Sequence, residues 1–137
     1  MAGGNPKIDL IKRVPLFASI SKSELAEVAS IADEIDLPKG KVLIQQGDTG
    51  REFFILIEGT ADVVRDERHV AELGPGDFFG EIALISKVPR NATITTTSPV
   101  RALVITDRAF RALLDHSPTI QIGVLLALAE RIAPTAL

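Results

Sequence analysis

The sequence predicts a mainly β domain that is flanked by helices at both ends. Between residues 37 and 106, short apolar runs alternate with turn sequences rich in Gly, Pro and Asp, a pattern typical of a β-sandwich or barrel. Before and after this stretch, apolar residues recur at the spacing of amphipathic helices. The chain has 137 residues, 46% of them hydrophobic, which is the size of one domain with a substantial core.

The N-terminal segment, residues 7–36, is expected to be helical and to follow a loose tail over residues 1–6. Ser21 and Glu24 stand at the spacing of a capping box, in which each side chain satisfies a free backbone N–H at the start of a helix. Apolar residues follow at helical spacing and predict a helix over 21–33.

The β part is expected to occupy residues 37–106. Its apolar runs are five or six residues long, and turn sequences such as Gly74-Pro-Gly-Asp77 separate them. Runs of this length bounded by turns indicate short strands. The expected strands are 41–45, 53–57, 61–65, 69–73, 92–97 and 100–105.

Residues 107–133 are expected to form two helices. Thr106 or Asp107 can cap the first of them. Pro118 suits the first position of the second helix, which is expected to end near Ile132.

The most informative stretch is residues 79–93, FGEIALISKVPRNAT, which places Glu81 nine residues before Arg90. A helix starting at Gly80 would direct free backbone N–H groups and a positive dipole end at a bound anion. Arg90 would grip that anion with a planar fork of donors, and Glu81 would accept from a sugar hydroxyl beside it. The combination indicates a nucleotide pocket. The alternative is a surface turn with a solvated ion pair.

This stretch resembles the phosphate-binding cassette of the cyclic nucleotide-binding domain family, FGE-[LI]-A-L-[IL]-x-x-x-P-R-x-A-[TS]-V, without a break through Pro-Arg. The resemblance extends from about Leu16 to about Ile132. It implies that residues 1–137 form a single such domain. The implied fold is an antiparallel β-roll (a double-stranded β-helix or jelly roll) with N-terminal helices, a short cassette helix and two C-terminal lid helices.

The resemblance also assigns the phosphate site. It implies that Arg90 pairs with the cyclic phosphate and that Ile82 and Ala83 offer backbone N–H groups. Ala92 allows close packing. Asn91 departs from the Ala, Ser or Thr that is common at this position, and as a donor and acceptor it can reach the phosphate or the base.

For the sugar, the resemblance implies that Glu81 takes the ribose 2′-hydroxyl and that Gly80 lets the backbone approach. Arg131, late in the last helix, is a candidate to close over the base, with a solvated arginine as the alternative. The residues expected to flank the base are Val63, Ala71, Leu73, Phe79, Thr93 and Arg131.

The function implied is that of a non-catalytic allosteric sensor that binds a cyclic nucleotide and acts through movement of its C-terminal helices. The family as a whole favours cAMP, whereas Asn91 leaves cGMP open. The effector domain is expected in the same or a partner chain, and the oligomeric state is not predicted. The alternative is a degenerate member of the family that serves as a protein-interaction or dimerisation module.

Composition argues against other classes of function. There is no Cys, and the only histidines, His69 and His116, lie in no ligand pattern, so we expect no metal, no catalytic site and no cofactor besides the ligand. The net charge of −3 gives no sign of the excess of basic residues that is typical of proteins that bind nucleic acid. The longest apolar run, residues 124–129, is too short to cross a membrane, and no signal pattern begins the chain. We therefore expect a cytoplasmic protein.

Overall fold

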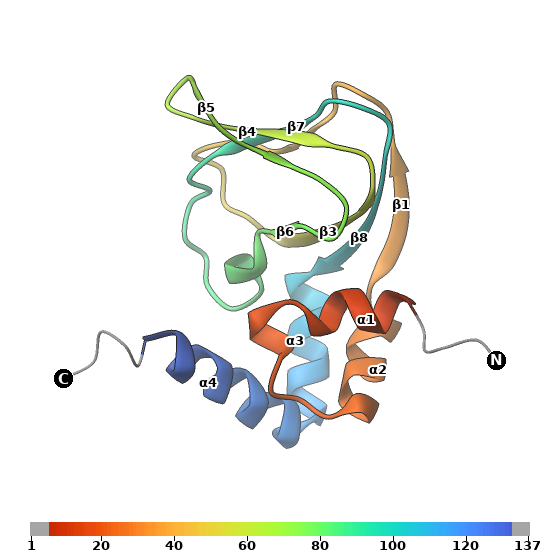
Figure 1. The fold of residues 1–137 in the computed structure, drawn as a ribbon. Helices are drawn as coiled ribbons and strands as arrows, with labels where there is room; N and C mark the ends of the chain where they lie inside the picture. Colours follow the sequence, from red (N-terminus) through yellow and green to blue (C-terminus); the bar gives the residue numbers. More distant parts are fainter. Residues whose placement is uncertain (1–5, 133–137) are drawn as a thin grey trace. The chain divides into compact units, whose positions relative to one another are not determined.

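The computed structural model describes residues 6–132, the last two by their backbone only. Its residues divide into two compact units, which are drawn in Figure 1. A β unit comprises residues 32–108, and a helical unit comprises the residues up to 31 and those from 109 onward. Each unit is described separately below.

The β unit consists of two four-stranded antiparallel sheets, which form two layers in Figure 1. The first sheet has the order β1 (Asp33–Leu37), β8 (Val100–Thr106), β3 (Glu52–Glu58) and β6 (Phe78–Phe79). The second has the order β2 (Val42–Ile44), β7 (Thr93–Thr96), β4 (Ala61–Arg65) and β5 (Arg68–Leu73). The predicted mainly β fold class is confirmed.

Alternating apolar residues join the two sheets in one hydrophobic cluster. On β8, Val100, Ala102 and Val104 face the cluster, as the two-residue period of a strand requires. They meet Phe54 and Leu56 from β3, and the second sheet contributes Ile44, Ala61 and Ile94. This cluster fixes the separation of the sheets and therefore the walls of any pocket between their strands.

The strand β1 was not predicted. Residues up to 36 were expected to belong to the N-terminal helical segment, with a helix over 21–33, but residues 33–37 form a strand. Helix α2 (Lys22–Ser30) stops at Ser30, and residues 33–37 pair with β8 along their whole length. The sequence DEIDL places Ile35 and Leu37 half-buried and its acids in solvent, so the segment is an edge strand with a charged outer face. Pairing with β8 prevails over local helix preference here.

The helical unit contains α1 (Pro6–Lys12), the 3₁₀ turn η1 (Pro15–Phe17), α2, all but the first two residues of α3 (Asp107–His116), and α4 (Pro118–Ile132). The predicted capping box is confirmed: the Ser21 hydroxyl accepts from the Glu24 N–H at 3.2 Å, and the Glu24 carboxylate accepts from the Ser21 N–H at 2.8 Å. Hydrogen bonds from Ser21, together with one from Thr119, lower the pKa of Glu24. The rings of Phe17 and Phe110 meet edge to face with centroids 5.7 Å apart.

No single helix in the described part of the chain is long and apolar enough to cross a membrane. The helices α3 and α4 reach that length and apolar character only when taken together, and the pair is bent by 117° at the break between them.

Thr96, on β7, is the one buried polar residue of the described core, with 2% of its surface exposed. Its hydroxyl donates to the Pro38 carbonyl at 2.7 Å and accepts from the Lys41 N–H at 2.8 Å. Valine has the same shape but would leave both groups without a partner, so Thr96→Val is expected to lower the free energy of unfolding by about 1–3 kcal/mol. Urea denaturation measures this loss.

The matched control is Thr95→Val, because the neighbouring Thr95 is half-buried and its hydroxyl has no recorded hydrogen bond within the described chain. An equal loss of stability in both variants would show that the Thr96 hydroxyl contributes nothing specific.

Candidate functional site

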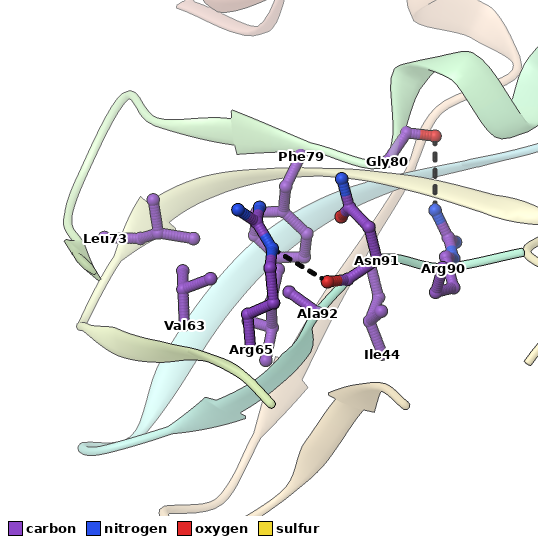
Figure 2. Close-up of a pocket in the computed structure, with 10 residues that line it drawn as sticks. Ile44, Val63, Arg65, Leu73, Phe79, Gly80, Arg90, Asn91 and Ala92 are labelled. Carbon is purple, nitrogen blue, oxygen red and sulfur yellow. Dashed lines mark hydrogen bonds between the residues drawn. The ribbon is translucent and has the colours of Figure 1, made fainter. Parts of the chain in front are cut away.

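A cavity of about 200 Å³ lies in the β unit beside the cassette. It is framed by β2, β4, β5, β6 and β7 and by the segment that leads into β7, as Figure 2 shows. Ten residues line it: Ile44, Val63, Arg65, Leu73, Phe79, Gly80, Arg90, Asn91, Ala92 and Ile94. Apolar side chains therefore form most of the wall, and two arginines supply its charge.

The backbone of Arg90 is anchored on both sides to the turn between β2 and β3. Its N–H donates to the Asp48 carbonyl at 2.8 Å, and its own carbonyl accepts from the Gly47 N–H at 2.8 Å. The preceding residue, Pro89, forms a bridge with Thr49. This arrangement fixes where the Arg90 side chain leaves the chain.

The guanidinium of Arg90 is also held in place. One amino group, Nη2, donates to the Glu52 carbonyl at 2.5 Å, and the other, Nη1, makes a weaker contact with the Gly80 carbonyl at 3.5 Å. Burial lowers the pKa of Arg90, and the charge of Glu52 raises it in part. An arginine pKa lies so far above neutrality that the group keeps its charge. A half-buried, oriented cation therefore stands at one end of the cavity.

Gly80 shapes the chain beside this cation. Its φ of +84° lies in the left-handed region, which glycine adopts without cost. A Cβ at this position would stand 2.8 Å from the Glu52 carbonyl oxygen and 2.6 Å from Arg90 Nη1. The 3₁₀ turn η2 (Glu81–Leu84) begins directly afterwards. The backbone can therefore approach Arg90 only because residue 80 lacks a side chain.

Val63 and Leu73 form an apolar wall of the cavity from β4 and β5. Both are half-buried. Phe79 closes the wall from β6, where its ring stacks on Phe54 with centroids 5.2 Å apart. A planar apolar group of modest size fits such a surface.

The structure brings together seven of the residues that were expected in the site, namely Val63, Leu73, Phe79, Gly80, Arg90, Asn91 and Ala92. Sequence reasoning missed three further lining residues, Ile44, Arg65 and Ile94. Arg65 follows Val63 by two positions on the same strand, so the period of a strand was a signal that could have identified it.

The other expected cassette residues do not line the cavity in this structure. Glu81 is half-buried at the start of η2. Ile82 follows it, and the N–H of Ala83 donates to the Gly80 carbonyl at 3.1 Å. The N–H of Ala83 is therefore used within the turn, and neither Ile82 nor Ala83 lines the cavity.

Two expected base-flanking residues are not among the residues that line the cavity. Ala71 stands opposite Val63 in the β4–β5 register, but its short side chain is exposed. Thr93 alternates with Ile94 on β7, and its hydroxyl accepts from the Gln46 N–H at 3.0 Å. The side chain of Arg131 lies outside the described residues.

The chemistry of the cavity suits a small organic anion. The arginines Arg65 and Arg90 line it, and none of its ten lining residues is a carboxylate. In the described chain, no group of three or more His, Cys, Asp or Glu residues is placed to hold a metal ion. In a ligand that joins a phosphate to a flat apolar group, the phosphate would pair with one arginine and the flat group would pack on the apolar wall beside it.

Comparison with known proteins identifies the family. The family model of the cyclic nucleotide-binding domain matches residues 34–117. The chain is 37% identical over 110 residues to a cAMP-dependent protein kinase regulatory subunit of Mycosarcoma maydis, covering 74% of this chain and 21% of that protein. It is 36% identical over 128 residues to a cyclic nucleotide-gated potassium channel of Rhizobium etli, covering 93% and 34% respectively. The chain thus spans about a fifth to a third of the length of these relatives.

Solved structures share the fold. The crystal structure of the N-terminal domain of a transcriptional regulator from Streptomyces coelicolor A3(2) has a TM-score of 0.85 at 30% identity, covering 93% of this chain and 94% of that one. The regulatory domain of Toxoplasma gondii PKA, solved with cAMP, has a TM-score of 0.68 at 28% identity, covering 82% and 46%. Because the family match covers more than half of the chain and includes the cassette, this chain belongs to the cyclic nucleotide-binding domain family.

Proposed function

We propose that this chain binds a cyclic nucleotide in the cavity beside the cassette and acts as a non-catalytic sensor. The observation that carries the proposal is Arg90, which is half-buried, charged and held by backbone carbonyls at one end of an apolar cavity. The cyclic phosphate pairs with this guanidinium, and the base lies toward Val63 and Leu73. The family membership supports this class of ligand.

Within the proposal, cAMP is the favoured nucleotide and cGMP the alternative. The names of the kinase relative and of the Toxoplasma structure both specify cAMP. Glu81 would take the ribose 2′-hydroxyl and Asn91 would contact the phosphate or the base, as the family pattern implies. The cavity, at about 200 Å³, is smaller than a typical ligand pocket of about 300–1,000 Å³, so the proposal includes a movement of the cassette when a nucleotide binds.

The proposed output is a shift between two populations. Phosphate binding would draw in the cassette, Leu84 and Ile85 would repack, and the helices that carry Phe110 and Leu113 would change position. The last helix would then cover the base, with Arg131 as its candidate contact. A ligand shifts this balance only if it binds the capped state more tightly than the open one. The regulated domain would lie in the same chain or in a partner.

Calorimetric titration of nucleotide-free protein with cAMP and cGMP tests the proposal. The expected result is micromolar or tighter binding of at least one nucleotide, with increased amide protection in residues 107–133 on saturation. Binding without any change in protection would contradict the switch but not the site. Absence of heat with both nucleotides would overturn the sensor.

The second candidate function is a protein-interaction or dimerisation module. It is favoured by α4, where Ile122, Leu125 and Leu126 are 55%, 64% and 52% exposed. Apolar side chains grouped on one helix are a usual feature of interaction surfaces. The titration separates the two candidates, since a degenerate module binds no nucleotide.

A further inference from the structure

Arg65 is a second arginine of the cavity, and it comes from a different element than Arg90. It is the last residue of β4 and points to the same face as Val63, two positions earlier. Both line the cavity, although Arg65 is exposed and therefore lies toward its mouth. Figure 2 shows its side chain beside Asn91, whose carbonyl accepts its hydrogen bond.

Hydrogen bonds hold both the Nε atom of Arg65 and the turn that follows Arg65 in the chain. Its Nε donates to the Asn91 carbonyl at 3.0 Å. The turn that follows consists of Asp66 and Glu67, both at positive φ, 52° and 66°. The side-chain amide of Gln46 holds this turn, donating to the Asp66 carboxylate at 2.7 Å and accepting from the Asp66 N–H at 3.0 Å. The hairpin therefore presents Arg65 in a defined place.

The two amino groups of Arg65 remain available. A guanidinium has five N–H donors, and only the one on Nε has a recorded acceptor within the described chain. No carboxylate lines the cavity to neutralise the charge. A ligand with paired acceptors can therefore complete the donor set of Arg65 without displacing a protein group.

The positions of the two arginines imply which part of a nucleotide Arg65 would meet. Arg90 stands at the Gly80 end of the cavity, where the phosphate is proposed to bind. Val63 and Arg65 lie on the same face of β4, so a base that packs on Val63 would lie within reach of the Arg65 side chain. Guanine carries two acceptors on its outer edge, N7 and O6, which match an arginine fork, whereas adenine pairs the N7 acceptor with an amino donor.

We propose that Arg65 reads the base of the bound nucleotide by donating to the N7 and O6 edge of a purine. The inference rests on the proposed function and deepens it. Arg65 makes two hydrogen bonds to a 6-oxopurine and one to adenine, so it raises the affinity for cGMP more than that for cAMP. This holds whichever of the two nucleotides binds more tightly overall.

The experiment measures the dissociation constants of cAMP, cGMP and cIMP for the wild type, Arg65→Ala and Arg68→Ala by calorimetry. Cyclic IMP has O6 but lacks the 2-amino group of guanine. Arg65→Ala is expected to weaken cGMP and cIMP about tenfold more than cAMP. Arg68 is the matched control, because it is an exposed arginine paired with Arg65 in the hairpin register and lines no part of the cavity. Its variant is expected to bind all three nucleotides within about twofold of the wild type.

Other outcomes overturn the inference. An equal loss for all three nucleotides would mean that Arg65 acts by charge or by positioning Asn91 and does not read the base. No loss would make it a solvated residue of the hairpin. If the wild type binds no nucleotide, the proposed function fails and this inference fails with it. If the wild type binds nucleotide and the Arg65→Ala substitution does not change its affinity, the inference about Arg65 fails but the proposed function stands.

Discussion

Arg90→Ala is expected to weaken cyclic nucleotide binding by about 30-fold to several thousand-fold. Removing one partner of a desolvated charge pair costs about 2–5 kcal/mol, and each 1.4 kcal/mol is a factor of ten in affinity. Arg90 is half-buried, so a phosphate bound to it as proposed would be partly shielded from water and salt. Calorimetry with the nucleotide that the wild type prefers measures this loss.

Arg90→Lys separates the charge of the residue from its geometry. Lysine keeps the positive charge but lacks the planar fork that here holds the Glu52 and Gly80 carbonyls. Its affinity is therefore expected to lie between those of the wild type and of Arg90→Ala. Thermal unfolding of each variant without ligand shows whether the fold is retained. Wild-type affinity in a folded Arg90→Ala protein would show that the phosphate does not bind at this cation.

Gly80→Ala is expected to reduce both stability and nucleotide affinity. A non-glycine residue in the left-handed region costs about 1–3 kcal/mol, and φ at Gly80 is +84°. The new Cβ would also stand 2.6 Å from Arg90 Nη1, so the guanidinium must leave its present position. Chemical denaturation measures the first effect, and titration with nucleotide measures the second.

Gly74→Ala is the matched control for this substitution. Gly74 is not among the glycines with positive φ, and a Cβ there would meet no atom within 4 Å. We expect the control to retain its affinity and to match or slightly exceed the stability of the wild type, because alanine restricts the unfolded chain. If the two alanine variants behaved alike, neither the positive φ nor the closeness to Arg90 would matter at residue 80.

The sequence was sufficient for most of the β unit because turns and apolar runs are local signals. Strand β4 was predicted with its observed bounds, and the ends of the other expected strands differ from the observed ends by at most one residue. The failure at β1 has a non-local cause. Its five residues are stabilised by pairing with β8, which lies more than sixty positions away in the chain. The sequence of β1, DEIDL, is rich in acidic residues and does not indicate that pairing.

The candidate site was predictable to the extent that it lies within one contiguous motif. Arg90, Asn91 and Gly80 follow from the cassette alone. Arg65 belongs to the cavity only because β4 pairs with β7 and so brings its end beside Asn91, a register that no short motif encodes. Thr93 illustrates the converse, since alternation along β7 turns its side chain away from Ile94 and from the cavity.

The anchoring of Arg90 has a consequence for the time course of binding. Two hydrogen bonds hold the backbone of Arg90, and two carbonyl contacts hold its guanidinium, before any ligand arrives. An incoming phosphate does not have to immobilise a flexible chain, so little entropy is lost at that contact. Variants that loosen Arg90 should therefore change the residence time of the nucleotide far more than its association rate, because differences in affinity among variants of one site lie mostly in dissociation.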